Sequence, residues 1–171
     1  DMTRGKGEFT PPDATYPNGT HVAEVEVDPL TGTVSIVNYT IVDDFGIAVN
    51  PLLLAGQVHG GVAQGIGQAL LEHTVFDKDG QLISASLMDY TLPRADDLPS
   101  FHFETKNVPS TTNPLGIKGA GEAGSIGSTP AVMNAVIDAL DRAYGIRHLQ
   151  MPATPHRIFE AIRASSRLAA E

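Results

Sequence analysis

Strict alternation of apolar and acidic side chains near the start of the chain limits the possible folds most strongly. Residues 21–28, HVAEVEVD, place alanine and valine on one face and glutamate and aspartate on the other. A period of two indicates a β-strand with one buried and one hydrated face. The following DPLTG has proline at its second position and a closing glycine, as a tight turn requires. Residues 33–44, TVSIVNYTIVDD, are apolar on both sides and predict a second, more buried strand, so the two form a hairpin.

A glycine-rich segment with helical periodicity follows the hairpin. Apolar residues recur every three or four positions and predict a helix over about 57–73. Four glycines interrupt this helix, at positions 60, 61, 65 and 67, and each costs up to about 1 kcal/mol relative to alanine. A helix with this composition needs a bare face for close packing. Either a second helix or a ligand could occupy that face.

The rest of the chain predicts one short strand and two further helices. Residues 81–93 are expected to be extended, and alternation over 101–108 predicts a strand. A helix over about 129–144 is expected to begin at an N-cap, Ser128 or Thr129, with Pro130 in its first turn, and to end at Gly145. Thr154 and Pro155 open the last helix. The pattern indicates an α+β fold in which a mostly antiparallel sheet, including the hairpin, packs against the glycine-rich helix and two C-terminal helices.

Composition narrows the classes of function. The 171 residues carry a net charge of −9, which disfavours nucleic acids and anionic membranes as partners. The sequence has no cysteine, which excludes disulfides, thiol catalysis and cysteine-ligated iron–sulfur clusters within this chain and is compatible with the cytoplasm. No apolar run approaches the length of a membrane span, and the six histidines lack zinc-site spacing. We expect an irregular segment over 1–19, one domain over 20–165 and a tail over 166–171.

Residues 118–127, KGAGEAGSIG, form the most unusual motif. GAGEAG matches the dinucleotide fingerprint G-x-G-x-x-G, but a proline-containing loop precedes it instead of a strand, and no acid follows at a strand end. A phosphate cradle is disfavoured because Glu122 would repel the anion. Two interpretations remain open. Glu122 either sits near a helix N-terminus because the helix dipole favours it there, or it acts on a ligand.

Five ordered blocks together resemble the molybdenum hydroxylases, the family of xanthine dehydrogenase, aldehyde oxidase and the carbon monoxide dehydrogenase large subunit. The blocks are HVAEVEVDPLTG, GQVHGGVAQGIGQALLE, MDYTLPRADDLP, NPLGIKGAGEAGSIGSTPAVMNAVIDAL and MPATPHRIFEAI. They cover about residues 16–164 and resemble the last part of the molybdopterin-binding subunit. The bacterial branch that uses the cytosine dinucleotide form of the cofactor is the most similar.

The resemblance assigns expected roles to individual residues. Glu122 matches the family's general base beside the molybdenum, which removes a proton while water supplies the oxygen added to the substrate. Gln57 matches a glutamine that hydrogen-bonds the pterin. The remaining expected cofactor-binding residues are Gln64, Gly60, Gly61, Lys118, Gly119, Ala120 and Gly121. No side chain is expected to ligate a metal, because the family holds molybdenum through the pterin.

The resemblance also implies missing parts. Family large subunits are several times longer, and their first molybdenum-binding half has no counterpart here. We therefore expect the isolated chain to be inactive and without molybdenum. Its expected partners are that missing half, iron–sulfur and FAD modules, and an aldehyde, N-heterocycle or related small substrate. The alternative is a non-catalytic assembly domain.

Overall fold

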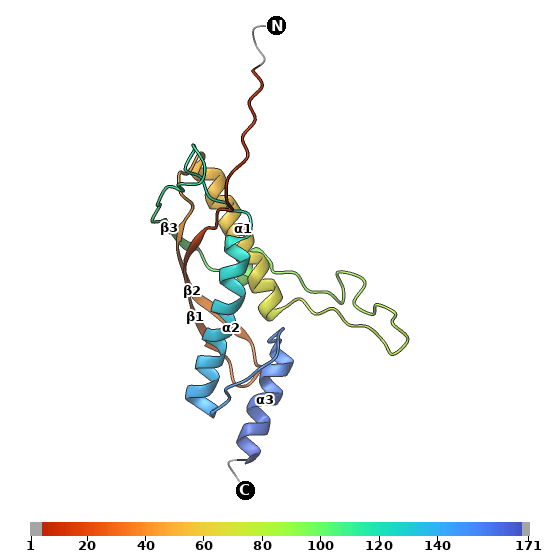
Figure 1. Cartoon of the computed structure of the whole chain (residues 1–171). Helices are drawn as coiled ribbons and strands as arrows, with labels where there is room; N and C mark the ends of the chain where they lie inside the picture. Colours follow the sequence, from red (N-terminus) through yellow and green to blue (C-terminus); the bar gives the residue numbers. More distant parts are fainter. Residues whose placement is uncertain (1–4, 169–171) are drawn as a thin grey trace.

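A computed structural model describes residues 5–168 and confirms the α+β fold (Figure 1). Three strands form one sheet in the order β1, β2, β3: Asn18–Val27, Val34–Asp44 and Phe101–Thr105. Strands β1 and β2 form the predicted antiparallel hairpin, whereas β3 pairs parallel with β2. The sheet is therefore mixed. Helices α1 (Pro51–Leu70), α2 (Ala123–Tyr144) and α3 (Pro155–Leu168) complete the fold, with a short 3₁₀ helix at Ala95–Asp97.

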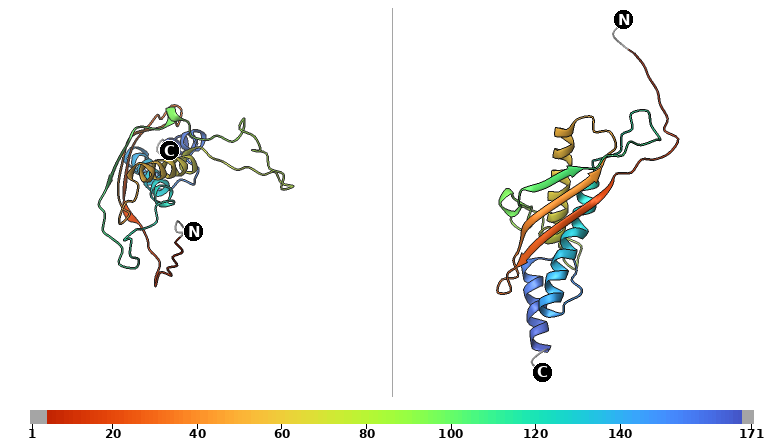
Figure 2. Two further views of the ribbon diagram at one scale, coloured as in Figure 1. Left: turned by 90° about the horizontal axis from the view of Figure 1, so that it is seen from above. Right: turned by 90° about the vertical axis from the view of Figure 1, so that its left-hand side faces the viewer.

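The hairpin follows the predicted alternation, but β1 begins at Asn18, inside the segment expected to be irregular. Strand β3 ends at Thr105, not at residue 108. Ala23, Val25 and Val27 turn toward the core while Glu24 and Glu26 are exposed. Helices α1 and α2 cover the inner face, and the strands run obliquely across them, while α3 lies beyond the end of the sheet (Figure 2). Most of the core comes from β2, α1, α2 and α3, and its fully buried side chains include Tyr39, Ile41, Phe45, Val58, Val62, Ile66, Val132, Val136, Leu140 and Ile158.

Helix α1 begins six residues before the predicted start. The side chain of Asn50 caps the helix by accepting a hydrogen bond from the Leu53 amide at 3.1 Å, and Pro51 occupies the first position. The helix ends at Leu70, not at residue 73. Leu52 and Leu53 are exposed, so apolar periodicity does not reveal the first turns, and the cap alone marks them.

Helix α2 also begins earlier than predicted, because Ser128 and Thr129 do not cap it. Their hydroxyl groups donate to the carbonyl oxygen of Ser125 at 3.5 and 3.2 Å, whereas a cap would accept from a backbone amide. The helix runs through Pro130, and the glycine-rich residues before it form its first turns. Gly145 ends the helix in the left-handed conformation, as predicted.

The last helix begins at Pro155, as predicted, and extends to Leu168. Residues 81–93 form no strand, although they were expected to be extended: one isolated bridge joins Phe76 to Leu82, and a turn spans residues 86–90. Of the expected N-terminal segment and tail, residues 1–4 and 169–171 lie outside the described residues. No helix in the described part of the chain has the length and apolarity needed to cross a membrane.

Candidate functional site

Glycines let helices α1 and α2 pack closely together, which brings the expected site residues near each other. A Cβ atom added to Gly61 on α1 would lie 2.9 Å from the amide nitrogen of Ser125 and 3.0 Å from the Cα of Gly124, both in the first turn of α2. Gly65 faces Ser128 in the same way. Close packing of two helices therefore accounts for these two glycines. The contact fixes the start of α2, which directly follows Glu122, against the middle of α1.

Gly60 differs from its neighbours because no atom lies within 4 Å of a Cβ added there. Gln57 and Gln64 are exposed together with Gly60. At 100° per residue, Gln57 and Gln64 lie about 40° and 60° around α1 from Gly61, both on the same side. They therefore flank the contact with α2 on its solvent side. Gln64 also lines a polar cleft of about 540 Å³ that reaches Glu72 and Tyr90.

Glu122 immediately precedes α2. Its backbone carbonyl accepts hydrogen bonds from the Ser125 hydroxyl and the Ile126 amide, both at 3.0 Å. The carboxylate is exposed, and no hydrogen bond or ion pair joins it to another described residue. Gly119 and Gly121 are exposed too, and a Cβ added to either would meet no atom within 4 Å. The loop thus presents one free carboxylate with open space on its N-terminal side.

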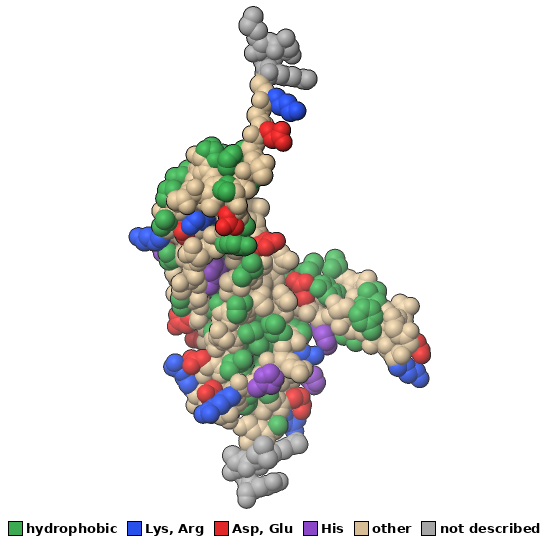
Figure 3. Space-filling model, viewed as in Figure 1, with side chains coloured by type: hydrophobic (Ala, Val, Ile, Leu, Met, Phe, Trp, Pro, Cys, Tyr) green, Lys and Arg blue, Asp and Glu red, His purple; other side chains and the backbone are tan. Residues whose placement is uncertain are grey.

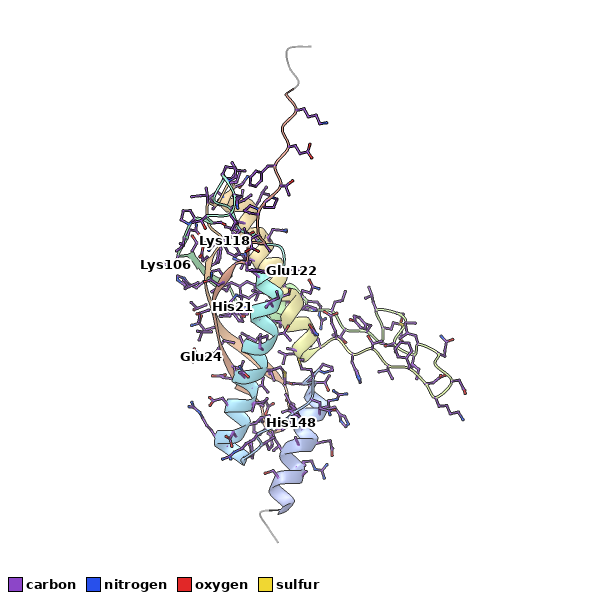
Figure 4. The ribbon with its side chains drawn as sticks, viewed as in Figure 1. His21, Glu24, Lys106, Lys118, Glu122 and His148 are labelled. Atoms are coloured by element: carbon purple, nitrogen blue, oxygen red, sulfur yellow. The ribbon has the colours of Figure 1, made fainter. Side chains whose placement is uncertain are left out.

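Lys118 anchors this loop and is not free for a ligand. Its backbone amide donates to the Phe45 carbonyl at 3.0 Å, and its ammonium group pairs with the Asp44 carboxylate at 2.5 Å. Figure 4 shows Lys118 and Glu122 near the start of α2, with His21 nearby on β1. Ala120 adds an apolar contact with the core. The contacts of Lys118 and Ala120 fix the backbone on either side of Gly119 and directly before Gly121, so both exposed glycines lie in an anchored loop.

Asp44 is the acceptor on which the anchor depends. Its side chain is 10% exposed and also accepts hydrogen bonds from the amides of Gly46 at 2.8 Å and Val108 at 3.0 Å. Burial alone would raise the pKa of Asp44, but the hydrogen bonds from Lys118, Val108 and Gly46 outweigh it and hold the pKa at about 2. Asp44 therefore stays ionised at neutral pH. Its contacts join the end of β2 to the loop at Val108 and to the loop at Lys118.

A second buried polar cluster, formed by His21, Tyr39 and Asp43, was not predicted from the sequence. The His21 ring contacts the Tyr39 hydroxyl at 2.9 Å and the Asp43 carboxylate at 3.4 Å. Burial raises the pKa of Tyr39, and the charge of Asp43 adds to this effect. Gly127 of α2 packs directly on the His21 ring. The one sequence feature that could have indicated buried roles for Asp43 and Asp44 is their position as a pair of acids at the end of an apolar strand.

Among the described residues, no group of three or more histidine, cysteine, aspartate or glutamate side chains is placed to hold a metal ion. The open surface is instead made of amides, glycines and one carboxylate. Such groups suit an organic ligand with many hydrogen-bonding atoms. The residues before GAGEAG form a loop and not a strand, as expected, so the dinucleotide fingerprint lacks its structural context.

Comparisons with known proteins agree with this chemistry. Residues 2–99 match the family model described as molybdopterin cofactor-binding domain. The chain is 36% identical over 155 residues to the carbon monoxide dehydrogenase large chain of Hydrogenophaga pseudoflava, covering 91% of this chain and 19% of the relative. It is 40% identical over 148 residues to the nicotine 6-hydroxylase large subunit of Paenarthrobacter nicotinovorans, covering 86% and 18%.

A solved structure has a similar fold. Quinoline 2-oxidoreductase from Pseudomonas putida 86 superposes with a TM-score of 0.83 and 41% identity, over 86% of this chain and 19% of that chain. The chain therefore spans about a fifth of the length of the relatives it matches.

Proposed function

Because the chain belongs to the molybdopterin cofactor-binding domain family of molybdenum hydroxylase large subunits, we propose that it supplies part of the cofactor site and the catalytic base for oxidative hydroxylation. The observation that carries this proposal is the contact of Gly61 with the first turn of α2. It sets the exposed Gln57–Gln64 face of α1 beside the loop that carries Glu122.

The open residues suit the cofactor. Glutamine side chains both donate and accept hydrogen bonds, so Gln57 and Gln64 can pair with the mixed donor and acceptor edge of a pterin. Gly60, Gly119 and Gly121 leave space where side chains would keep a bulky group away. Gly61 and Lys118 have packing and anchoring contacts in this structure, so their support for the cofactor site is indirect. We further propose the cytosine dinucleotide form of the cofactor.

Glu122 is proposed as the group that accepts a proton during hydroxylation. Bound molybdopterin would supply a redox-active molybdenum centre, with water as the source of oxygen. The exposed carboxylate has no partner among the described residues, so it is free to accept a proton. The Lys118–Asp44 pair fixes the loop, and a positioned base is more effective than a mobile one.

We propose that the whole enzyme includes the missing half of the large subunit and iron–sulfur and FAD modules, and that it works in the cytoplasm. The substrate class is an aldehyde, an N-heterocycle or a related small molecule. Two of the relatives are named for N-heterocycles, nicotine and quinoline. A match of 40% identity makes a hybrid practical, in which this chain replaces the matching segment of the nicotine 6-hydroxylase large subunit.

The hybrid tests the role of Glu122. We expect Glu122→Gln to retain molybdenum and to lower kcat by about 100-fold or more, as removal of a general base does. Glu24→Gln is the matched control, since Glu24 is an exposed carboxylate on β1. A Glu122→Gln hybrid that keeps its turnover would reject the base role and favour a non-catalytic assembly domain.

A further inference from the structure

Residues 73–92, here called the arm, leave the end of α1 and project far from the rest of the molecule (Figure 1). The chain returns to the body at Pro93, which packs against Gly67 of α1. Although the arm stands apart, its residues form many local contacts. This segment needs an explanation because the sheet and helices form their core without it.

Hydrogen bonds at the base and the tip hold the arm in shape. At the base, the Tyr90 hydroxyl donates to the Glu72 carboxylate at 2.5 Å. Midway, the Val75 amide donates to the Ser84 hydroxyl at 2.9 Å. At the tip, the Asp77 carboxylate accepts from the amides of residues 79 and 81, both at 2.9 Å. An arm that is ordered before binding loses less conformational entropy when it docks.

The arm exposes large apolar side chains along its length (Figure 3). Met88 is 95% exposed and Leu87 is 77% exposed. The others, between 46% and 59% exposed, are Phe76, Ile83 and Leu92. Clustered apolar exposure of this kind marks a surface that another molecule covers.

We propose that the arm docks into the remainder of a molybdenum hydroxylase large subunit and helps to join it to this chain. Relatives are about five times longer than the matched region, so the remainder of such a large subunit offers ample chain to cover the arm. Tyr90 on the arm lines the same cleft as Gln64, so a docked remainder would lie beside the candidate cofactor surface. The identity of the occupant rests on the proposed function.

Charge disfavours the other two occupants. The net charge of −9 makes two copies of the chain repel each other and also opposes binding to an anionic lipid surface. Acidic side chains lie among the apolar ones on the arm, at Asp77, Asp79 and Asp89. An interface with a larger polypeptide can pair these acids with basic groups, whereas an anionic lipid surface offers none.

Oxidation of methionine by hydrogen peroxide tests the docking directly, because its rate follows side-chain exposure. In the isolated chain, Met88 should oxidise fast and Met133, which is 7% exposed, slowly. In the hybrid large subunit, we expect oxidation of Met88 to slow by at least about tenfold, toward the rate of Met133. Fast oxidation of Met88 in the assembled hybrid would overturn the proposal. Protection of Met88 in the isolated chain at high concentration would instead indicate self-association and also overturn it.

Substitution tests the energetics with the chain and the remainder supplied as separate polypeptides. Leu87→Asp combined with Met88→Asp should weaken their association by about 100-fold or more, since two large apolar contacts are lost. Leu30→Asp is the matched control, because Leu30 is 82% exposed in the β1–β2 turn and should leave the association unchanged. Equal binding by both variants, or no binding by the unaltered chain, would overturn the proposal. Hybrids that turn over substrate with an oxidisable Met88 would refute the docking and leave the proposed function intact.

Discussion

Replacing Asp44 with asparagine tests the anchor that fixes the Glu122 loop. Asparagine keeps the shape and the acceptor oxygen of the side chain but removes the charge that pairs with Lys118. The carboxyl pKa falls from its ordinary value of 3.8 to about 2 in the folded protein. Because the folded pKa is the lower one, the stabilisation is complete above the unfolded pKa and is lost as the pH falls from about 5 to 2.

The magnitude follows from the same two pKa values. Each pKa unit between the folded and unfolded states is worth about 1.4 kcal/mol, so a fall from 3.8 to about 2 gives an upper limit of about 2.5 kcal/mol. Some solvent reaches the pair, so we expect about 1–2 kcal/mol. The other carboxylates contribute equally to both proteins, and their effect cancels in the difference between wild type and variant.

Urea unfolding followed by circular dichroism measures this difference. The free energy of unfolding of wild type minus that of Asp44→Asn should shrink by about 1–2 kcal/mol between pH 5 and pH 2. Lys118→Met is the companion variant, and it should destabilise the protein at pH 7 because it leaves Asp44 charged and largely buried. A difference that stays constant over this pH range would refute the reasoning, since Asp44 would then titrate normally in the folded state.

Two further predictions concern packing and the arm. Gly124→Val should lower the free energy of unfolding by about 3 kcal/mol, because the new side chain would collide with the backbone of α1, whereas Gly60→Ala should leave stability unchanged or raise it by up to about 1 kcal/mol. Equal thermal melts for these two variants would show that the helices do not pack as described. Tyr90→Phe removes the hydrogen bond to Glu72 and should speed proteolysis within the arm while global stability changes by less than about 1 kcal/mol. Unchanged cleavage rates would show that this bond does not clamp the arm.

Sequence patterns predicted the parts of the fold that depend on neighbouring residues, namely strand alternation, turns and helix ends. The turn before Gly32 and the left-handed cap at Gly145 were predicted correctly. The alternation around Val25 identified β1, although the strand begins at Asn18, three residues before the predicted His21. The first residues of α1 and α2 were predicted less accurately, because both helices begin earlier than the sequence indicated. The segment before Ser128 has so many glycines that its helical turns, which are stabilised by packing on α1, resemble a loop in the sequence.

Contacts between distant segments were beyond the reach of sequence patterns. Asp44 and Lys118 are 74 positions apart, and only the fold shows that they pair. Glycine spacing alone left two explanations for α1, a second helix or a ligand. The structure shows that Gly61 and Gly65 pack on α2, whereas Gly60 stays open. The roles of Glu122 and the cofactor-facing residues stay predictions, because exposure and position support them without testing them.

The molybdenum content of two preparations tests the central claim, that this chain is one part of a shared cofactor site, most directly. Elemental analysis should find no stoichiometric molybdenum on the isolated 171-residue chain. The hybrid with the nicotine 6-hydroxylase remainder should hold about one molybdenum per large subunit, as one complete site per subunit requires. Stoichiometric molybdenum on the isolated chain, or a folded hybrid that binds none under conditions that load the parent enzyme, would contradict the account.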